Sequence, residues 1–375
     1  MAAVSPDRLA DVHARVRGAF RVLLLYDVAD EIRLEALRAE RKLPRAEPRP
    51  AGAIPEGLQF ERPPVLEPLD PFEVETGETL RGRIHYYDYG VVSVELELRF
   101  DLTWVDLVAR ASRWLAAPEI GGKVVEGLHA RLDRAAKAFV NPYANWLTED
   151  YYIIHLFPME DADFRPITAV ELLASRSAEI AQLVRGEPAP LSESECQEIF
   201  QSRISYYPSD LLVAGWTAAV LYDAPERAAP TIQLLEYANT QLLEFRHYDE
   251  LLSEVLKTVY RSLGKGRRFW VRWRLAAEAE RLNAIRLDVM ELMERTDNAI
   301  KFLSDMFYAR LYRVAASRVG VPDYRNLVER KLRAAGELYQ FMVDQFQHTR
   351  AFLLEATVVV ILIVELVALF RGKGV

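Results

Sequence analysis

The sequence has 375 residues, 51% of them hydrophobic, so it is long enough for two domains and apolar enough to bury a sizeable core. Its net charge of −8 excludes a protein that binds nucleic acid over its whole surface, although local basic clusters are compatible with it. The single cysteine, Cys196, excludes an internal disulfide and a multi-cysteine zinc site, and it favours a reducing compartment.

The first elements predicted are a strand and a helix. Before Ala19 there is no apolar run of signal-peptide length, so no secretion signal is predicted. Residues 19–26 have the length of a buried strand, and residues 28–41 show helical periodicity. Eight prolines crowd the segment 43–71, which excludes a continuous helix or a central strand and predicts an extended crossing or linker.

A hairpin, helices and further strands follow the prolines. Residues 80–87 and 91–100 are predicted to pair as a hairpin around Asp88, Tyr89 and Gly90, because VSVELELRF alternates polar and apolar residues. Two helices over 104–116 and 119–139 precede a strand over 150–157. The order strand, helix, strand, strand, helix, strand predicts a ferredoxin-like α+β domain.

This first domain is predicted to span residues 1–228, with the proline-rich segment 43–71 inside it. Its last part contains a helix over 167–185 and another over 192–202, where Ser192 and Glu195 have capping-box spacing. The apolar stretch 211–222 is predicted to be a strand or a strand pair that closes the domain.

Heptad patterns dominate the second half of the chain. Apolar residues recur with spacings of three and four along three runs, and only Asp249 interrupts the first. The sequence therefore predicts a long antiparallel coiled-coil stalk over residues 229–350 that self-associates or packs on itself. The seam residues singled out are Leu235, Leu242, Phe245, Leu332, Tyr339, Met342 and Phe346.

The most apolar segment lies at residues 351–371 and is predicted to be a transmembrane tail. About 20 residues at a rise of about 1.5 Å per residue just reach the roughly 30 Å of a bilayer core. Glu365 is costly in hydrocarbon unless it faces another helix, so it indicates an oligomer seam or a shallow insertion. The alternative is a helix buried in a soluble oligomer.

A basic, aromatic turn precedes the second heptad run, within residues 261–274. Two partners fit cations interleaved with tryptophans, namely anionic lipid headgroups and RNA. A solvated helix start, with its tryptophans packed on the first domain, fits equally well. The contact residues singled out are Arg267, Arg268, Trp270, Arg272, Trp273 and Arg274.

No catalytic, cofactor or metal site is predicted. The six histidines form no close pairs and no H-E-x-x-H motif, and the glycine–lysine sequences lack the spacing of a phosphate-binding loop. The carboxylates Glu236, Glu244, Asp249 and Glu250 are interpreted as solvated or paired along their own helix. No small-molecule substrate is identified.

Several short patterns resemble a known family, the domain of unknown function 155 family, which includes the required-for-meiotic-nuclear-division proteins of mitochondria and their yeast relatives. The residues that carry the resemblance are Tyr89–Val92, Ser205–Tyr207, Asp210–Val213, Trp216, Leu234–Asn239, Gln241–Glu244 and Tyr248–Asp249. The resemblance implies a membrane-associated, oligomer-forming, non-enzymatic protein that in mitochondria is linked to the support of translation. It implies no catalytic residue.

These observations lead to the hypothesis of a membrane-tethered, self-associating scaffold. The bulk of the chain is expected in the cytoplasm or an organelle matrix, with a homo-oligomer held to the membrane by its C-terminal helix. Two alternatives are an RNA- or ribosome-contacting module that uses the turn 261–274, and a hydrolase with a site in the first domain.

Overall fold

The computed structural model describes residues 15–41, 62–73, 77–116, 119–264, 280–291, 293–294 and 306–372. The chain divides into two compact units. The first unit comprises Met1–His247 with Met293–Tyr324, and the second comprises Tyr248–Leu292 with Arg325–Val375.

The first unit is built on one eight-stranded sheet with the order β2-β3-β4-β1-β5-β8-β7-β6. Neighbouring strands are antiparallel except for β5 and β8, which pair in parallel. The strands are β1 (Arg15–Ile32), β2 (Val65–Glu73), β3 (Thr79–Tyr86), β4 (Val91–Thr103), β5 (Phe139–Leu156), β6 (Arg203–Ile204), β7 (Leu211–Ala214) and β8 (Ala218–Tyr222).

Some helices of this unit begin at side-chain caps. Thr168 and Glu171 form a reciprocal capping box at the start of α4, and the Ser192 hydroxyl accepts the Glu195 N–H at the start of α5. The helices are α1 (Leu34–Arg41), α2 (Trp104–Leu115), α3 (Glu119–Arg134), α4 (Ala169–Arg185), α5 (Glu193–Phe200) and α8 (Met306–Val319), together with the first part of α6 (Pro225–Gly264).

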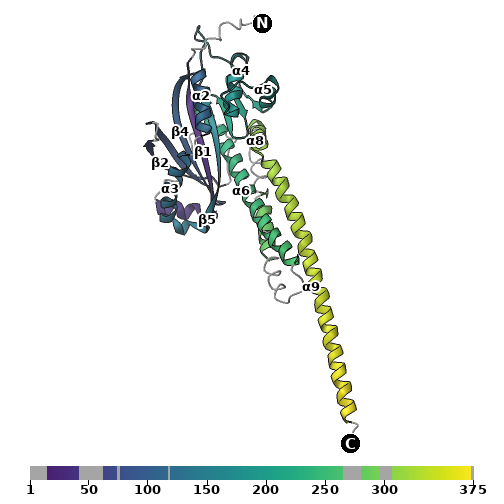
Figure 1. The fold of residues 1–375 in the computed structure, drawn as a ribbon. Helices are drawn as coiled ribbons and strands as arrows, with labels where there is room; N and C mark the ends of the chain where they lie inside the picture. Colours follow the sequence, from purple (N-terminus) through teal and green to yellow (C-terminus); the bar gives the residue numbers. More distant parts are fainter. Residues whose placement is uncertain are drawn as a thin grey trace. The chain divides into compact units, whose positions relative to one another are not determined.

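Both faces of the sheet are covered, and they differ in character. Because side chains alternate along a strand, Val22, Leu24 and Tyr26 of β1 enter an apolar core that includes residues of α2 and α4. The intervening residues of β1 point to the opposite face, along which α6 runs (Figure 1). This second face carries charged side chains, and they form the candidate site described below.

The predicted hairpin is confirmed, because β3 and β4 pair antiparallel with His85 opposite Ser93. Gly90 in the turn has a φ of 93°, and a Cβ placed there would lie 1.8 Å from the Ala29 carbonyl oxygen. Only glycine fits this close approach. Pro68 and Pro71 lie in β2, at the edge of the sheet, where a missing N–H costs least.

The ferredoxin-like domain predicted from the element order is wrong. The strand over 150–157 is the end of the much longer β5, which continues the sheet through a parallel partner, β8, to the hairpin of β7 and β8. The result is a mixed sheet of eight strands with helices on both faces. The order of short apolar runs did not reveal this, because it does not encode which strands become neighbours.

The second unit is helical. The end of α6, the helical residues 280–291 and the start of α9 (Val321–Gly372) contribute its buried side chains. These are Leu252, Val255, Leu256, Leu282, Ile285, Val289, Val328 and Ala335. Lys331 of α9 lies 2.5 Å from the Asp249 carboxylate and 2.6 Å from the Ser253 hydroxyl, both on α6. Asp249, which interrupts the heptad pattern, is therefore the ion-pair partner of Lys331.

The predicted coiled-coil stalk over residues 229–350 is not supported. Leu235, Leu242 and Phe245 are buried in the first unit, where this part of α6 covers the sheet, and α8 belongs to the same unit. Their apolar stripe is used against a sheet and not in a helix seam. Heptad spacing alone does not distinguish the two, because any helix with one buried face repeats every three to four residues.

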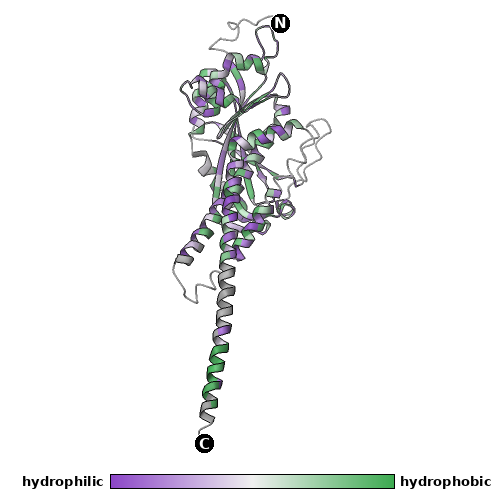
Figure 2. Cartoon of the chain, turned by 90° about the vertical axis from the view of Figure 1, so that its right-hand side faces the viewer, coloured by the Kyte–Doolittle hydropathy of each residue, from purple (hydrophilic) through white to green (hydrophobic). Residues whose placement is uncertain are grey.

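The predicted transmembrane tail is also wrong. Residues 351–371 are the end of α9, not a separate hydrophobic helix. Within the part of the chain that the structure describes, no helix combines the length and the apolarity needed to cross a membrane. The acidic residue Glu365 interrupts the apolar run. Figure 2 shows the run itself as hydrophobic residues near the end of α9.

Candidate functional site

A row of charged side chains follows the sheet face that α6 covers. Strand register explains the row, because Arg21 of β1 lies opposite Glu97 of β4, and Arg83 of β3 lies opposite Glu95 of β4. The alternation of VSVELELRF puts Ser93, Glu95 and Glu97 on this face and the intervening valines and leucines on the other. The polar half of the pattern is thus directed at α6.

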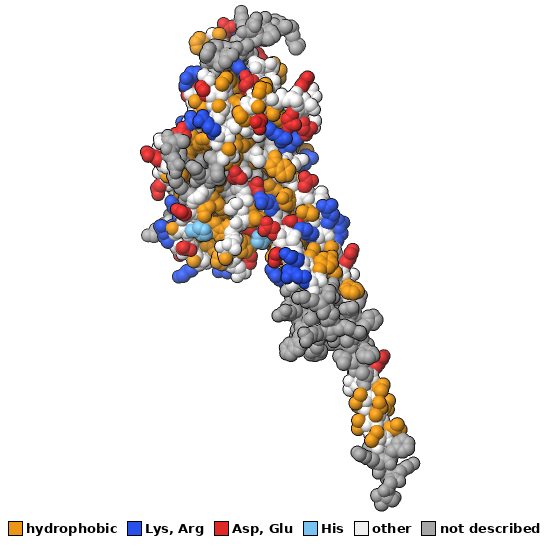
Figure 3. Space-filling view, viewed as in Figure 1, with side chains coloured by type: hydrophobic (Ala, Val, Ile, Leu, Met, Phe, Trp, Pro, Cys, Tyr) orange, Lys and Arg blue, Asp and Glu red, His pale blue; other side chains and the backbone are white. Residues whose placement is uncertain are grey.

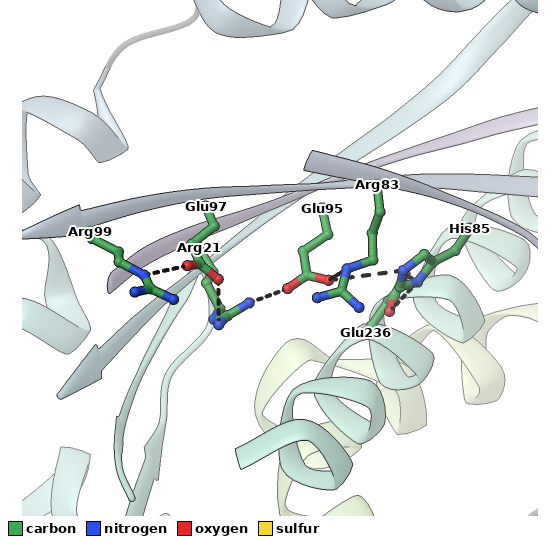
Figure 4. A network of polar contacts seen from close by, with 7 residues as sticks. All are labelled: Arg21, Arg83, His85, Glu95, Glu97, Arg99 and Glu236. Carbon is green, nitrogen blue, oxygen red and sulfur yellow. Dashed lines mark hydrogen bonds and ion pairs between the residues drawn. The ribbon is translucent and has the colours of Figure 1, made fainter. Parts of the chain in front are cut away.

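The charges of the row compensate one another (Figure 4). Arg21 bridges two carboxylates, with Nη1 2.5 Å from Glu95 Oε1 and Nη2 2.6 Å from Glu97 Oε2. Arg83 lies 3.0 Å from the second oxygen of Glu95, and Arg99 lies 3.2 Å from Glu97. The exposed fraction of the side chain rises from 6% at Glu95 to 74% at Arg99, so the row runs from the interior to solvent.

At its inner end the row meets α6 through a buried ion pair. His85 Nδ1 lies 2.7 Å from Glu236 Oε1, and Glu236 is 1% exposed. Burial lowers the pKa of His85, but the Glu236 carboxylate more than offsets this effect, so the pKa is raised. Burial raises the pKa of Glu236, yet His85 and the Ser93 and Tyr87 hydroxyls bring it below its usual range. Each group therefore favours the charged form of the other.

A second contact between sheet and helix joins Asp27 of β1 to His247 of α6, at 2.6 Å. The ring of Tyr143 stacks on His247, and its hydroxyl donates to Asp30. Burial raises the pKa of Asp27, although the neighbouring His247 works against this effect. Arg246 of α6 also pairs with Glu149 of β5.

These contacts show what the arrangement does chemically. Each of the two histidines is held by a carboxylate, and the buried His155 meets the Asp223 carbonyl oxygen at 3.0 Å. Burial lowers the pKa of His155 to about 4, so it is neutral at pH 7. Among the described residues, no group of three or more histidine, cysteine or acidic side chains is arranged to hold a metal ion. The charged row joins helix to sheet.

The sheet-bearing part of the chain matches a known family. Residues 17–228, more than half of the 375, match the model described as "Uncharacterized protein MJ0711, N-terminal domain". The chain belongs to the MJ0711 N-terminal domain family. Uncharacterized protein MJ0711 of Methanocaldococcus jannaschii is 22% identical over 188 residues, which are 50% of this chain and 58% of that protein. The chain therefore matches a little over half of that relative's length, and no solved structure matches it.

The family match corrects the resemblance drawn from short patterns. The domain of unknown function 155 family is not supported, because the matching model is the MJ0711 N-terminal domain. Its range includes Arg21, Arg83, His85 and Glu95 but ends at residue 228, before Glu236. The charged row of the sheet thus lies within the MJ0711 N-terminal domain, and its counter-charge on α6 lies beyond the matched range.

The sequence did not reveal the His85–Glu236 pair. Glu236 was interpreted as solvated or paired along its helix, but it is buried against the sheet. The signal available in the sequence was the position of Glu236 between two largely apolar residues, Leu235 and Tyr237. The structure buries both of them. A carboxylate inside the apolar face of a helix needs a cation, and the polar face of β3 and β4 supplies one.

Some of the remaining predicted seam and contact residues are described by the structure, and others are not. Leu332 is half-buried and Tyr339 is 41% exposed on α9, while Glu365 is exposed. The side chains of Met342 and Phe346, and the whole turn segment with Arg267, Arg268, Trp270, Arg272, Trp273 and Arg274, lie outside the described residues.

A second surface of possible function follows Tyr339 along α9. Residues Val358–Val364 are consecutive and apolar, and each leaves more than half of its surface exposed. Leu366, Val367 and Leu369 continue the exposed apolar surface beyond Glu365. Figure 3 shows these side chains gathered near the end of α9. We refer to residues 358–369 as the apolar end of α9.

Proposed function

We propose that the protein is a self-associating interaction protein, and that the apolar end of α9 is the contact between its copies. One observation carries the proposal. The seven exposed apolar residues Val358–Val364 make about two helical turns, so apolar side chains project from every side of the helix. A helix that is apolar all round is typical of a segment enclosed by other protein or by lipid.

The physical argument is the cost of leaving this surface in water. Exposed apolar area is unfavourable by roughly 25 cal/mol per Å², and monomers rarely expose a contiguous apolar patch of more than a few hundred Å². A single neighbouring helix covers one side only. Several copies that align their α9 helices would cover the remaining sides.

A bundle of copies fits this helix better than a lipid environment does. Glu365 lies inside the apolar end and is exposed. An ionised carboxylate in hydrocarbon is costly, whereas in a bundle it can point to water or to a cation of another copy. Association with a membrane surface is the competing occupant and an outcome of the experiment below.

The experiment is sedimentation velocity of the full chain without detergent, for the wild type and for the double variant Val360→Asp/Ile363→Asp. We expect the wild type to sediment as an oligomer and the variant as a smaller species, because two carboxylates on one face oppose close packing. Val105→Asp is the matched control, since Val105 is an isolated exposed valine on α2.

Flotation with vesicles of phosphatidylcholine and phosphatidylglycerol is run in parallel. A wild type that is monomeric at all concentrations contradicts self-association. If the monomer also floats with the vesicles and the double variant does not, the apolar end binds lipid and the membrane-associated hypothesis replaces this one.

The hydrolase alternative receives less support from the first unit. There, His85 and His247 are ion-paired with buried carboxylates, and His155 contacts a backbone carbonyl. These contacts join β3, β1 and β5 to other elements, and we interpret them as structural. They favour an interaction protein over an enzyme.

A further inference from the structure

Aromatic side chains gather on the surface of the first unit where the loop between β6 and β7 meets α8. Tyr206 is 55% exposed and Tyr207 is 54% exposed. The ring of Tyr206 lies 4.7 Å from that of Tyr207 and 4.8 Å from that of Phe307, measured between centroids. Met306 beside them is 76% exposed. We call this set the aromatic patch.

The loop itself holds the two tyrosines outward. The Asp210 carboxylate accepts the backbone N–H of Tyr206 at 2.8 Å and that of Tyr207 at 2.9 Å. The Ser205 hydroxyl donates to the Tyr207 carbonyl oxygen at 2.7 Å. Side-chain bonds to the backbone of this kind order a turn. The tyrosines are therefore displayed by a bonded loop. Their rings meet edge to face at 84°, and each side chain stays more than half exposed, so ring surface remains open to solvent.

Positive charge adjoins the aromatic patch. The Arg310 guanidinium lies 5.7 Å from the centroid of Phe307, and Arg313 follows one turn along α8. Both arginines are exposed, and no ion pair joins either one to a carboxylate among the described residues. In a chain of net charge −8, this combination of cations and open rings is a local feature that complements an anion.

We propose that the aromatic patch, with Arg310 and Arg313, binds single-stranded nucleic acid. Bases stack on tyrosine rings without regard to sequence, and guanidinium groups bind the phosphates between them. An acidic peptide would satisfy the arginines but would leave the flat faces of the tyrosines unused. The ligand that uses both kinds of group carries phosphates and planar bases on one flexible chain.

Fluorescence anisotropy of a labelled single-stranded RNA of mixed sequence, titrated with the full chain at low salt, tests the proposal. Tyr206→Ala/Tyr207→Ala should weaken binding by about 5- to 150-fold for each base that loses its stacking partner. Tyr206→Phe/Tyr207→Phe is the matched control, because phenylalanine keeps the ring and loses only the hydroxyl. It should bind like the wild type. Circular dichroism confirms that both double variants are folded.

The arginines are tested through salt dependence. Each phosphate contact adds about 0.7 to the magnitude of the slope of log K against log salt concentration for a single strand. Arg310→Gln/Arg313→Gln should therefore lower that magnitude by about 1.4. Both positions are exposed, so the fold should be unaffected.

Three results would overturn the proposal. The first is a wild type that does not bind the RNA at low salt. The second is equal affinity of the alanine and phenylalanine variants, which would place binding elsewhere. The third is displacement of the RNA by a poly-glutamate peptide of equal length at equal concentration, which would assign the surface to an acidic protein partner. Val360→Asp/Ile363→Asp should leave RNA affinity per chain unchanged, so failure of self-association and failure of this proposal are distinguishable.

Discussion

The sheet face under α6 and the apolar end of α9 differ in which side chains they bury. Under α6, charged groups are inside, with His85 8% and Glu236 1% exposed, and each has its counter-charge within the chain. At the end of α9, apolar groups are outside, with Val364 61% exposed. In the first region, His85 and Glu236 thus neutralise each other without a second molecule. The second has the composition of a protein interior but is exposed, which is why we propose that it makes contacts between molecules.

Breaking the His85–Glu236 pair is the strongest test of whether buried charges under α6 stabilise the fold by pairing. Glu236→Leu removes the nearest counter-charge of the buried His85 and leaves only Glu95, at 3.9 Å, so we expect the free energy of unfolding to fall by about 3–5 kcal/mol. Urea denaturation followed by circular dichroism measures the change. Glu250→Leu, at an exposed position of the same helix, is the control.

The double variant His85→Leu/Glu236→Leu sharpens this test. Replacing both members of a buried ion pair by apolar residues is often close to neutral, so the double variant should recover most of the loss. A double variant as unstable as the single one would show that Glu236 contributes through its packing and not through its charge.

The pH dependence of unfolding is expected to show the next largest effect. His155 takes up a proton near its ordinary pKa of 6.5 when unfolded, but only near pKa 4 when buried in the fold. The unfolded state binds the proton first, so stability is lost as the pH falls from 6.5 to 4, by up to about 3 kcal/mol. His155→Asn keeps an N–H donor and should flatten this dependence in denaturation series at each pH.

His85 supplies a contrast of opposite sign. Its pKa is raised in the fold, so its contribution is present below pH 6.5 and is lost as the pH rises through the raised value. Equal pH profiles for the wild type and His155→Asn would contradict the assignment of the acid side to His155.

Glu67 provides a smaller effect away from α6. Its carboxylate accepts hydrogen bonds from Arg41 of α1 at 2.8 Å, Arg131 of α3 at 2.9 Å and Tyr86 of β3 at 2.7 Å. Glu67→Gln removes the charge and should lower the free energy of unfolding by about 1.5–3 kcal/mol. Asp70→Asn is the control, because Asp70 is fully exposed and lies 3.8 Å from Arg131. Equal losses of stability in both variants would show that the buried Glu67 contributes no more than the exposed Asp70.

The smallest effect is expected at the apolar end of α9. Val360→Asp/Ile363→Asp should change the free energy of unfolding of the first unit by no more than about 0.5 kcal/mol, since exposed positions contribute little to folding. Tryptophan fluorescence, which reports on the buried Trp104 and Trp114, measures this unfolding. A large loss of stability would mean that the apolar end of α9 stabilises the chain internally. It would contradict the contrast drawn between the two regions.

The sequence predicted local structure well and long-range pairing poorly. Alternation in VSVELELRF indicated both the hairpin and its two unlike faces, and Ser192 with Glu195 located a helix start. The parallel pairing of β5 with β8 depends on contacts between distant segments, and no local pattern records it. The ferredoxin-like prediction failed at that step.

The candidate sites show the same limit. The apolar run of α9 is visible in the sequence because it is continuous, but its composition alone predicted a membrane crossing that the described helices do not support. Glu236 and Asp249 both looked like ordinary helix-surface acids. Their partners, His85 and Lys331, come from other elements, so only the fold shows that one is a buried counter-ion and the other joins two helices.

The placement of β1 has a consequence for the nascent chain. β1 is made first, yet its two neighbours are β4 and β5, and Gly18 pairs with Phe100 on one side and Leu156 on the other. Until residue 156 has left the ribosome, one edge of this long strand has no complete partner. Folding of such distant pairings is slow, and unpaired edges aggregate. During synthesis this unpaired edge is therefore open to pairing with other chains.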